Sequence, residues 1–270
     1  VEGWAEAHDD FAAPSPMAWE PMTAGIRASV LVYFLRREMA RPDGGIAGRL
    51  RTILAAHREY LTDQPRLKSN HAVWHAIGLF ELSRVFGDSS IRELALARLL
   101  DIATTQVSAD GCHKEHAPMY HFVVLEWLDQ IVTYLAGTPG FDWPGLETLR
   151  QVRERMIASG NFLQDHGGNI IPIGDSVRRP VPSVGLTAIP PARKLLFDRE
   201  AGYACYKESS SRRSGRQLVL NIQDRARPFP FHFHDDAAAL VYCYRGETIL
   251  GDAGMFAYDD SEQRRHVVSS

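Results

Sequence analysis

Apolar residues recur with the period of an α-helix over most of the first 160 residues. In the segment 21–40, Ile26, Val30, Tyr33 and Phe34 are spaced i, i+4, i+7 and i+8, which predicts a helix with these residues on its apolar face. Helical patterns of similar length follow at 48–63, 70–87, 89–107, 119–137 and 144–162. Gly, Asp or Pro stands between most neighbours, so the pattern predicts a stack of antiparallel helical hairpins.

The pattern changes after residue 165. The Gly/Pro-rich stretch GGNIIPIGDSVRRPVPSVG is typical of a linker, and from Phe197 onward short strand-like segments are separated by turn residues. These segments cover 202–208, 216–224, 237–246 and 247–252. We therefore expect an α+β protein with a helical domain at 1–165, a linker at 166–196 and the start of a β domain at 197–270. These strands are too few to close a β-sandwich, so we expect the chain to contain only part of the β domain.

Composition narrows the function classes. The chain has 270 residues and a net charge of -3, which argues against a nucleic-acid-binding protein, and its apolar runs are too short to cross a membrane. Cys112, Cys205 and Cys243 are widely spaced and include no CxxC pair, so they predict neither a disulfide framework nor a thiolate metal site.

Three segments carry candidate chemistry. In KSNHAVWHAIG, Asn70 suits a helix N-cap, and His71 and His75 have metal-ligand spacing without the Glu of an HExxH motif, which favours a buried core histidine. The segment DGCHKEHAPMYHF concentrates histidines, a glutamate and a tyrosine before a helix. In HFHDD, a strand would point His232 and His234 to the same face, where they could bind a metal ion or a polyanion.

Taken in order, these segments resemble the heparinase II/III-like family of polysaccharide lyases, which includes heparin, heparan sulfate and alginate lyases. The matching positions are Asn70, His71 and Gly78, then Asp110, Gly111, Glu115, Tyr120 and His121, then Pro172, Gly174 and Asp175, and finally His232, His234, Asp236, Asp252, Gly254 and Tyr258. The resemblance implies an incomplete (α/α) toroid followed by an antiparallel β-sandwich, with an acidic polysaccharide bound between them. It also implies a periplasmic or secreted protein, although no signal peptide is visible in this chain.

The activity implied by the resemblance is β-elimination at a uronic acid, in which the C5 proton is removed and the C4 oxygen leaves. Asn70 and His232 would neutralise the carboxylate, and Tyr120 would carry the proton, provided that its neighbours lower a pKa that is ordinarily about 10. His71 would act as the base or would tune Tyr120.

The resemblance also implies substrate-binding and metal-binding residues. Glu115, His121, Arg66 and Lys68 are the predicted substrate contacts, and Lys114, Arg178 and Arg179 are further basic candidates, although any one of them is equally explained as solubilising charge. His234 and Asp252 match positions that hold a structural zinc ion in the family. The third ligand is expected beyond the end of this sequence, and His266 stands too early and in the wrong context to replace it.

Two alternatives compete with a lyase. An H-x-H pair is also found in cupin barrels, which normally add a Glu a few residues later, where this chain has AAALVY. A non-catalytic glycan-binding or assembly protein with the same fold is the other alternative, because fold does not fix function.

Overall fold

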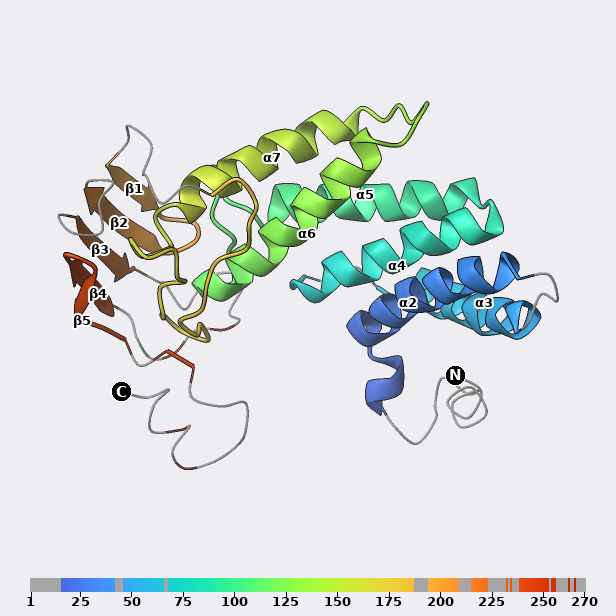
Figure 1. The fold of residues 1–270 in the computed structure, drawn as a ribbon, viewed down its shortest axis with the longest axis horizontal. Coiled ribbons are helices and arrows are strands. Elements are labelled where there is room, and N and C mark those ends of the chain that lie inside the picture. The colour runs from blue at the N-terminus through green and yellow to red at the C-terminus, as the bar shows by residue number, and fades with distance from the viewer. Residues whose placement is uncertain are drawn as a thin grey trace. The chain divides into compact units, whose positions relative to one another are not determined.

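In the computed structural model, the described residues form helices in the first part of the chain and strands in the second (Figure 1). The described residues are 16–41, 46–65, 68–186, 194–208, 215–222, 232, 234, 238–252, 254–255, 262 and 265. Arg66, Asp236, Tyr258 and His266 from the sequence predictions lie outside them. The packing divides the chain into two compact units, Val1–Ile102 and Ala103–Ser270.

The first unit consists of helices with well-defined ends. Its elements are the 3-10 turn η1 (Pro16–Trp19) and the helices α2 (Pro21–Met39), α3 (Ala47–Asp63), α4 (His71–Phe86) and most of α5 (Ser89–Thr105). Glu20 caps α2 by accepting a hydrogen bond from the Thr23 amide, and Pro21 occupies the first turn, where a missing N–H costs nothing. Gly87 ends α4 in the left-handed region with φ 64°. The predicted helices in this part of the chain are thus confirmed.

The buried face of α2 is not the face that its large apolar residues predict. Val30, Tyr33 and Phe34 are 48%, 56% and 43% exposed, so that prediction is wrong. The buried side carries Ala24, Gly25, Ala28, Leu31, Val32 and Leu35 instead. A Cβ on Gly25 would lie 2.5 Å from the carbonyl oxygen of Trp74, and one on Gly78 would lie 2.7 Å from the Cα of Gly25. Small residues therefore let α2 and α4 pack backbone against backbone.

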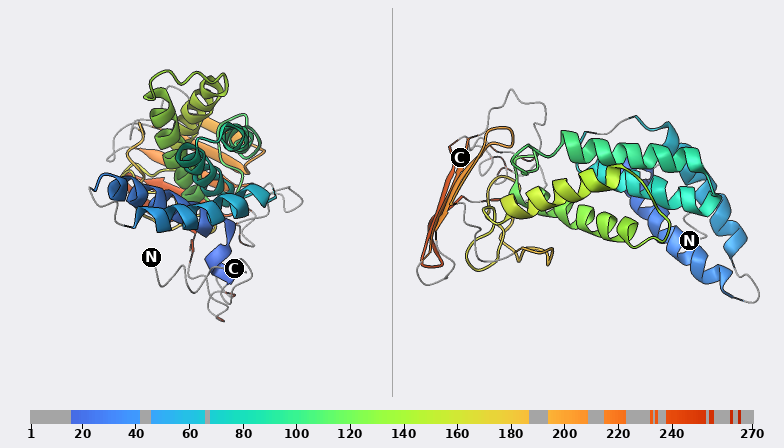
Figure 2. Two further views of the ribbon diagram at one scale, coloured as in Figure 1. Left: turned by 90° about the vertical axis from the view of Figure 1, so that its right-hand side faces the viewer. Right: turned by 90° about the horizontal axis from the view of Figure 1, so that it is seen from above.

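In the part of the second unit that the structure describes, the helices α6 and α7 accompany a β-sheet. It contains α6 (Pro118–Ala136), α7 (Gly145–Gly160), β1 (Leu195–Asp198), β2 (Tyr203–Glu208), β3 (Arg216–Asn221), β4 (Leu240–Tyr244) and β5 (Glu247–Leu250). All neighbouring strands are antiparallel and follow chain order, so the described strands form a five-stranded meander, seen nearly edge-on in the right view of Figure 2. The predicted strands and the α-then-β order are confirmed, whereas the toroid and a second sheet of a sandwich stay predictions.

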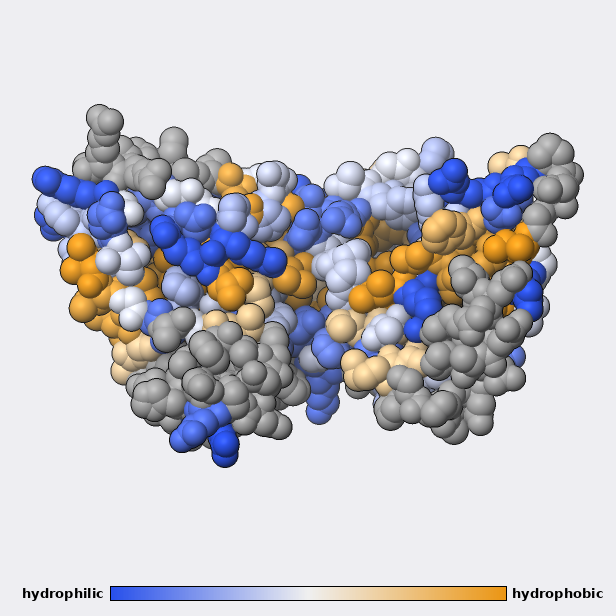
Figure 3. Space-filling model, turned by 60° about the horizontal axis from the view of Figure 1, so that its bottom comes forward, coloured by the Kyte–Doolittle hydropathy of each residue, from blue (hydrophilic) through white to orange (hydrophobic). Residues whose placement is uncertain are grey.

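The two faces of the sheet differ in their burial. Leu196, Cys205, Val219 and Val241 are paired across neighbouring strands and are all buried, so they form the core face. The opposite face is also apolar, and its residues Leu195, Phe197 and Leu250 are more than half exposed. Figure 3 shows apolar surface, in orange, on both units.

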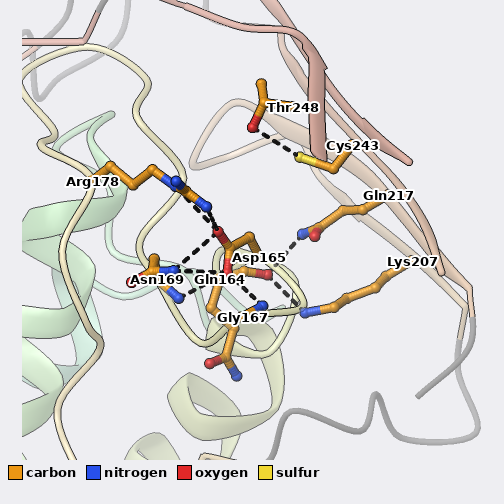
Figure 4. A network of polar contacts seen from close by, with 9 residues as sticks. All are labelled: Gln164, Asp165, Gly167, Asn169, Arg178, Lys207, Gln217, Cys243 and Thr248. Atoms are coloured by element: carbon orange, nitrogen blue, oxygen red, sulfur yellow. Dashed lines mark hydrogen bonds and ion pairs between the residues drawn. The ribbon is translucent and has the colours of Figure 1, made fainter. Parts of the chain in front are cut away.

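A polar network attaches the sheet to the segment that follows α7. Lys207 of β2 is 1% exposed and donates from Nζ to the carbonyl oxygens of Asn161 and Gln164, each at 2.7 Å. Figure 4 shows the contact with Gln164. Gln217 of β3 donates to the carbonyl oxygens of Phe162 and Gln164, each at 2.8 Å. These contacts join the residues after α7 to the sheet within the compact unit Ala103–Ser270, and the predicted domain bounds stay a prediction.

The segment predicted as a linker is packed over its described part, 166–186. Ile170, Ile171 and Ile173 are at most 1% exposed, and Asp175 and Ser176 are buried as well. A flexible connection between domains would expose such side chains, so this segment belongs to the core of the second unit.

Candidate active site

Asp175 connects the two histidines of the HFHDD segment. Its Oδ2 lies 3.2 Å from Nδ1 of His232, and its Oδ1 lies 3.0 Å from Nε2 of His234. The Asp175 amide also donates to the carbonyl oxygen of His232 at 3.0 Å. Burial alone would raise the pKa of the Asp175 carboxyl, but the hydrogen bonds from both imidazoles hold this pKa well below its usual range.

The backbone around Asp175 explains how the histidines reach it. His232 has φ 61° and is not in a strand, so the predicted strand geometry does not hold at this residue. Gly174 has φ 57°, and a Cβ there would lie 2.6 Å from the carbonyl oxygen of His232. The close approach needs a glycine, because any side chain would collide with that carbonyl. Both imidazoles thus meet at one carboxylate without sharing a strand face.

Tyr120 and His232 are stacked. Their ring centroids are 3.6 Å apart, with planes inclined by 14°. Tyr120 lies in the first turn of α6, and Ser176 fixes this turn by accepting a hydrogen bond from the Met119 amide at 3.0 Å. The same PIGDS segment therefore positions both stacked rings, His232 through Asp175 and Tyr120 through Ser176.

Glu115 faces the second nitrogen of His232. Its Oε2 lies 3.5 Å from Nε2 of His232, a longer contact than the one that Nδ1 makes with Asp175. Each N–H of a protonated His232 would therefore have a carboxylate acceptor. Glu115 is 1% exposed, so its position favours an action on His232 over direct contact with a polymer.

His121 is part of the core. It is 1% exposed, its Nε2 lies 3.0 Å from the carbonyl oxygen of Met156, and its Nδ1 accepts from the His113 amide at 3.3 Å. Burial lowers the pKa of His121 to about 3, so it is neutral. These surroundings give no support to the prediction that His121 binds substrate directly.

Asn70 and His71 lie in the first unit, at the start of α4. Asn70 occupies the N-cap position, but its side chain makes no capping hydrogen bond. The His71 side chain is 41% exposed, and its Nδ1 lies 3.2 Å from Oε1 of Glu20. His75 is buried and contacts Arg98, with Nδ1 3.0 Å from the guanidinium, so it is the satisfied core histidine that the spacing favoured.

The predicted zinc ligands occupy different surroundings. Nε2 of His234 is hydrogen-bonded to Asp175, so Nδ1 is the atom that could bind a metal ion. In metal sites, the histidine nitrogen that does not bind the metal commonly donates a hydrogen bond to a carboxylate. Asp252 accepts a hydrogen bond from the Gly254 amide at 2.7 Å and so closes a turn. The part of the chain that the structure describes contains no group of three or more His, Cys, Asp or Glu that could hold a metal ion. Zinc stays a prediction.

Two of the basic residues considered as substrate contacts form ion pairs within the protein. Lys114 forms an ion pair with Glu200 at 2.6 Å, and Arg178 forms one with Asp165 at 2.7 Å. Lys68 and Arg179 are exposed. Lys114 and Arg178 thus already have structural partners.

No protein-family model matches the chain, and no curated protein matches it either. Solved structures do match. A heparinase III structure has a TM-score of 0.82 at 13% identity and covers 99% of this chain and 48% of its own. A second heparinase III has a TM-score of 0.73 at 16% identity, covering 94% and 44%. Heparan sulfate lyase HepC from Pedobacter heparinus has a TM-score of 0.67 at 18% identity, covering 98% and 47%.

The chain therefore has the fold of these lyase structures over nearly its whole length and spans less than half of theirs. The family resemblance found in the sequence is confirmed as a likeness of fold. Among the helices described, none is long and apolar enough to cross a membrane.

Two residues of the site were not recognised as such in the sequence. In the sequence, Asp175 stands out only as a matching position beside Pro172 and Gly174, and its two histidine partners lie 57 and 59 positions away. No local sequence pattern indicates a role for Glu20, because its partner His71 lies 51 positions away along the chain.

Proposed function

We propose that this chain belongs to a polysaccharide lyase that cleaves a uronic-acid-containing polysaccharide by β-elimination. The observation that carries this proposal is the stacked Tyr120–His232 pair, in which the His232 ring lies between the carboxylates of Asp175 and Glu115. The fold shared with heparinase III and HepC supports the reaction class. An acidic polysaccharide as substrate and a periplasmic or secreted location are parts of the same proposal.

The reaction requires three tasks of the protein. It must neutralise the uronate carboxylate, remove the C5 proton, and protonate the C4 oxygen as the C4–O bond breaks. In the proposal, Asn70 donates a hydrogen bond to the carboxylate, and a protonated His232 offsets its charge as a cation as negative charge develops on it. The electron pair of the C5–H bond forms the C4–C5 double bond, and the glycosidic oxygen leaves with a proton.

Tyr120 is the proposed proton carrier. Its ring lies flat against His232, and a protonated imidazole in that position would favour the phenolate, which can accept the C5 proton. The resulting phenol can then give its proton to the leaving oxygen. His71, which presents an imidazole at the start of α4, is the alternative base for a uronate of the opposite C5 configuration.

Tyr120→Phe tests this assignment in the full-length protein. The variant keeps the ring and its stacking but removes the transferable proton, so we expect kcat to fall by roughly 10²-fold or more. The assay follows the absorbance of the 4,5-unsaturated product on a panel of uronate polymers. Tyr134→Phe, also on α6, is the matched control and should be active. Turnover near the wild-type rate in Tyr120→Phe would contradict the assignment.

The same assay separates the alternatives. A wild-type protein that binds a polymer of the panel without forming unsaturated product would be a non-catalytic glycan-binding protein. A cupin-like enzyme would lose activity on metal removal, whereas the lyase proposal assigns any zinc a structural role.

A further inference from the structure

A second carboxylate–imidazole pair lies in the first unit. Glu20 precedes α2 and His71 begins α4, and Oε1 of Glu20 lies 3.2 Å from Nδ1 of His71. The other carboxylate oxygen, Oε2, accepts hydrogen bonds from the Thr23 amide at 2.9 Å and the Thr23 hydroxyl at 3.2 Å. The carboxylate is thus held by the first turn of α2, and one of its oxygens is directed at the imidazole.

The charge state of Glu20 determines what it does to His71. Burial alone would raise the pKa of Glu20, but hydrogen bonds from the Thr23 and Met22 amides and the charge of His71 together lower this pKa. An ionised carboxylate only accepts hydrogen bonds, so the proton of a neutral His71 must stand on Nδ1. The lone pair then stands on Nε2, which is the atom that a general base uses.

We propose that Glu20 is a positioning residue that fixes the tautomer and ring orientation of His71 and so prepares Nε2 as a proton acceptor. The exposures agree with this division of roles, because the His71 side chain is 41% exposed and that of Glu20 only 23%. The inference rests on the proposed function as far as His71 acts in catalysis. The pairing itself does not depend on that function.

The other charged groups around the pair lie on the neighbouring helices of this unit. Tyr60 of α3 has a raised pKa, caused by burial and then by the charge of Glu20. His75 of α4 has a pKa lowered to about 4, chiefly by burial and then by Arg98 of α5. Both groups keep one charge state over the neutral range.

The first experiment measures the tautomer without using activity. Two-dimensional ¹H–¹⁵N spectra of full-length protein labelled at histidine nitrogens distinguish a protonated Nδ1 from a protonated Nε2. We expect the Nδ1–H form of His71 in the wild type. In Glu20→Gln we expect a shift toward the Nε2–H form, because the carboxylate that holds the proton on Nδ1 has been removed. An unchanged tautomer would overturn the pairing.

Kinetics then test whether the pair serves catalysis. On a polymer whose uronate requires His71 as the base, Glu20→Gln should lower kcat by roughly 10-fold or more with KM little changed, because the loss falls on the proton acceptor and not on substrate binding. Glu59→Gln, at an exposed position of α3, is the matched control, and its kcat and KM should equal those of the wild type. An unchanged kcat in Glu20→Gln on every polymer of the panel would overturn the positioning role.

The activity assay and the nitrogen spectra distinguish a failure of the proposed function from a failure of the Glu20–His71 pairing. If the wild type forms no unsaturated product from any uronate polymer, the proposed lyase function fails. The nitrogen spectra still decide whether Glu20 sets the tautomer of His71.

Discussion

Replacing Lys207 with Met should remove a pH dependence from the stability of the protein. Lys207 lies on the core face of β2, is 1% exposed, and has no carboxylate oxygen among its two hydrogen-bond acceptors. Burial lowers the pKa of its ammonium from 10.5 to about 8. A neutral amine still has two N–H groups, one for each carbonyl oxygen, so the network survives deprotonation. Met retains the apolar stem and removes the titrating group.

The size and sign of this pH dependence follow from the pKa of Lys207 in the unfolded chain, 10.5, and in the folded protein, about 8. At a pH between these two values, the unfolded chain holds the Lys207 proton and the folded protein has released it. The free energy of unfolding therefore rises with pH by about 1.4 kcal/mol per unit, or by about 2 kcal/mol between about pH 8 and about pH 10. The buried thiols act in the opposite direction, because burial raises the pKa of Cys112, Cys205 and Cys243, and stability falls when the unfolded thiols ionise. The quantity to measure is thus the difference between wild type and variant.

Urea unfolding at several pH values gives this difference directly. The wild type should gain about 2 kcal/mol relative to Lys207→Met over that pH range. Lys194→Met, at an exposed position, is the matched control and should follow the wild type. Parallel profiles of wild type and Lys207→Met would show that Lys207 does not titrate in this window, and would refute the reasoning.

Three further predictions concern the site. Asn70→Ala and His232→Ala should each lower kcat more than they raise KM, because their contacts strengthen in the transition state; a pure KM effect in steady-state kinetics would contradict this. Asp175→Asn should lower the free energy of unfolding by about 2 kcal/mol at neutral pH, because it weakens hydrogen bonds to two imidazoles. Urea titrations measure this change, and the surface variant Glu147→Gln, as the control, should change the free energy little. Because the folded pKa of Asp175 is depressed, its contribution is present above about pH 4 and is lost as the pH falls further, so the two unfolding curves should converge in acid. Metal analysis of the full-length protein should find zinc that is lost in His234→Ala, and a metal-free protein with full activity would contradict the zinc prediction.

The order of elements could be predicted from the sequence because local patterns determine it. Helical periodicity and Gly, Asp or Pro turns located the helices, and alternation located the strands, such as Tyr203–Glu208. The buried face of α2 was mispredicted because large apolar residues were weighted over small ones. Gly25 contributes no apolar side chain, yet it decides the face, since only a glycine permits the contact with Gly78.

The candidate site was predictable only in part, for a related reason. Tyr120 and His232 belong to motifs that identify them, and the structure stacks them. Their supporting carboxylates lie far away in the sequence, and no local pattern connects Asp175 to His234 or Glu20 to His71. The geometry of His232 was also missed, because its left-handed φ of 61° arises from the fold around Gly174 and not from a strand pattern.

The attachment of the sheet through Lys207 has a consequence for strand register. Side chains alternate between the faces of a strand, so a slip of β2 by one residue would exchange Lys207 for Tyr206 or Glu208 on the core face. Glu208 would then set a carboxylate against the carbonyl oxygens of Asn161 and Gln164, where no donor would satisfy either side. Apolar core residues tolerate such exchanges far better than a buried amine with two fixed acceptors. The lysine therefore favours the observed register of β2 over registers shifted by one residue.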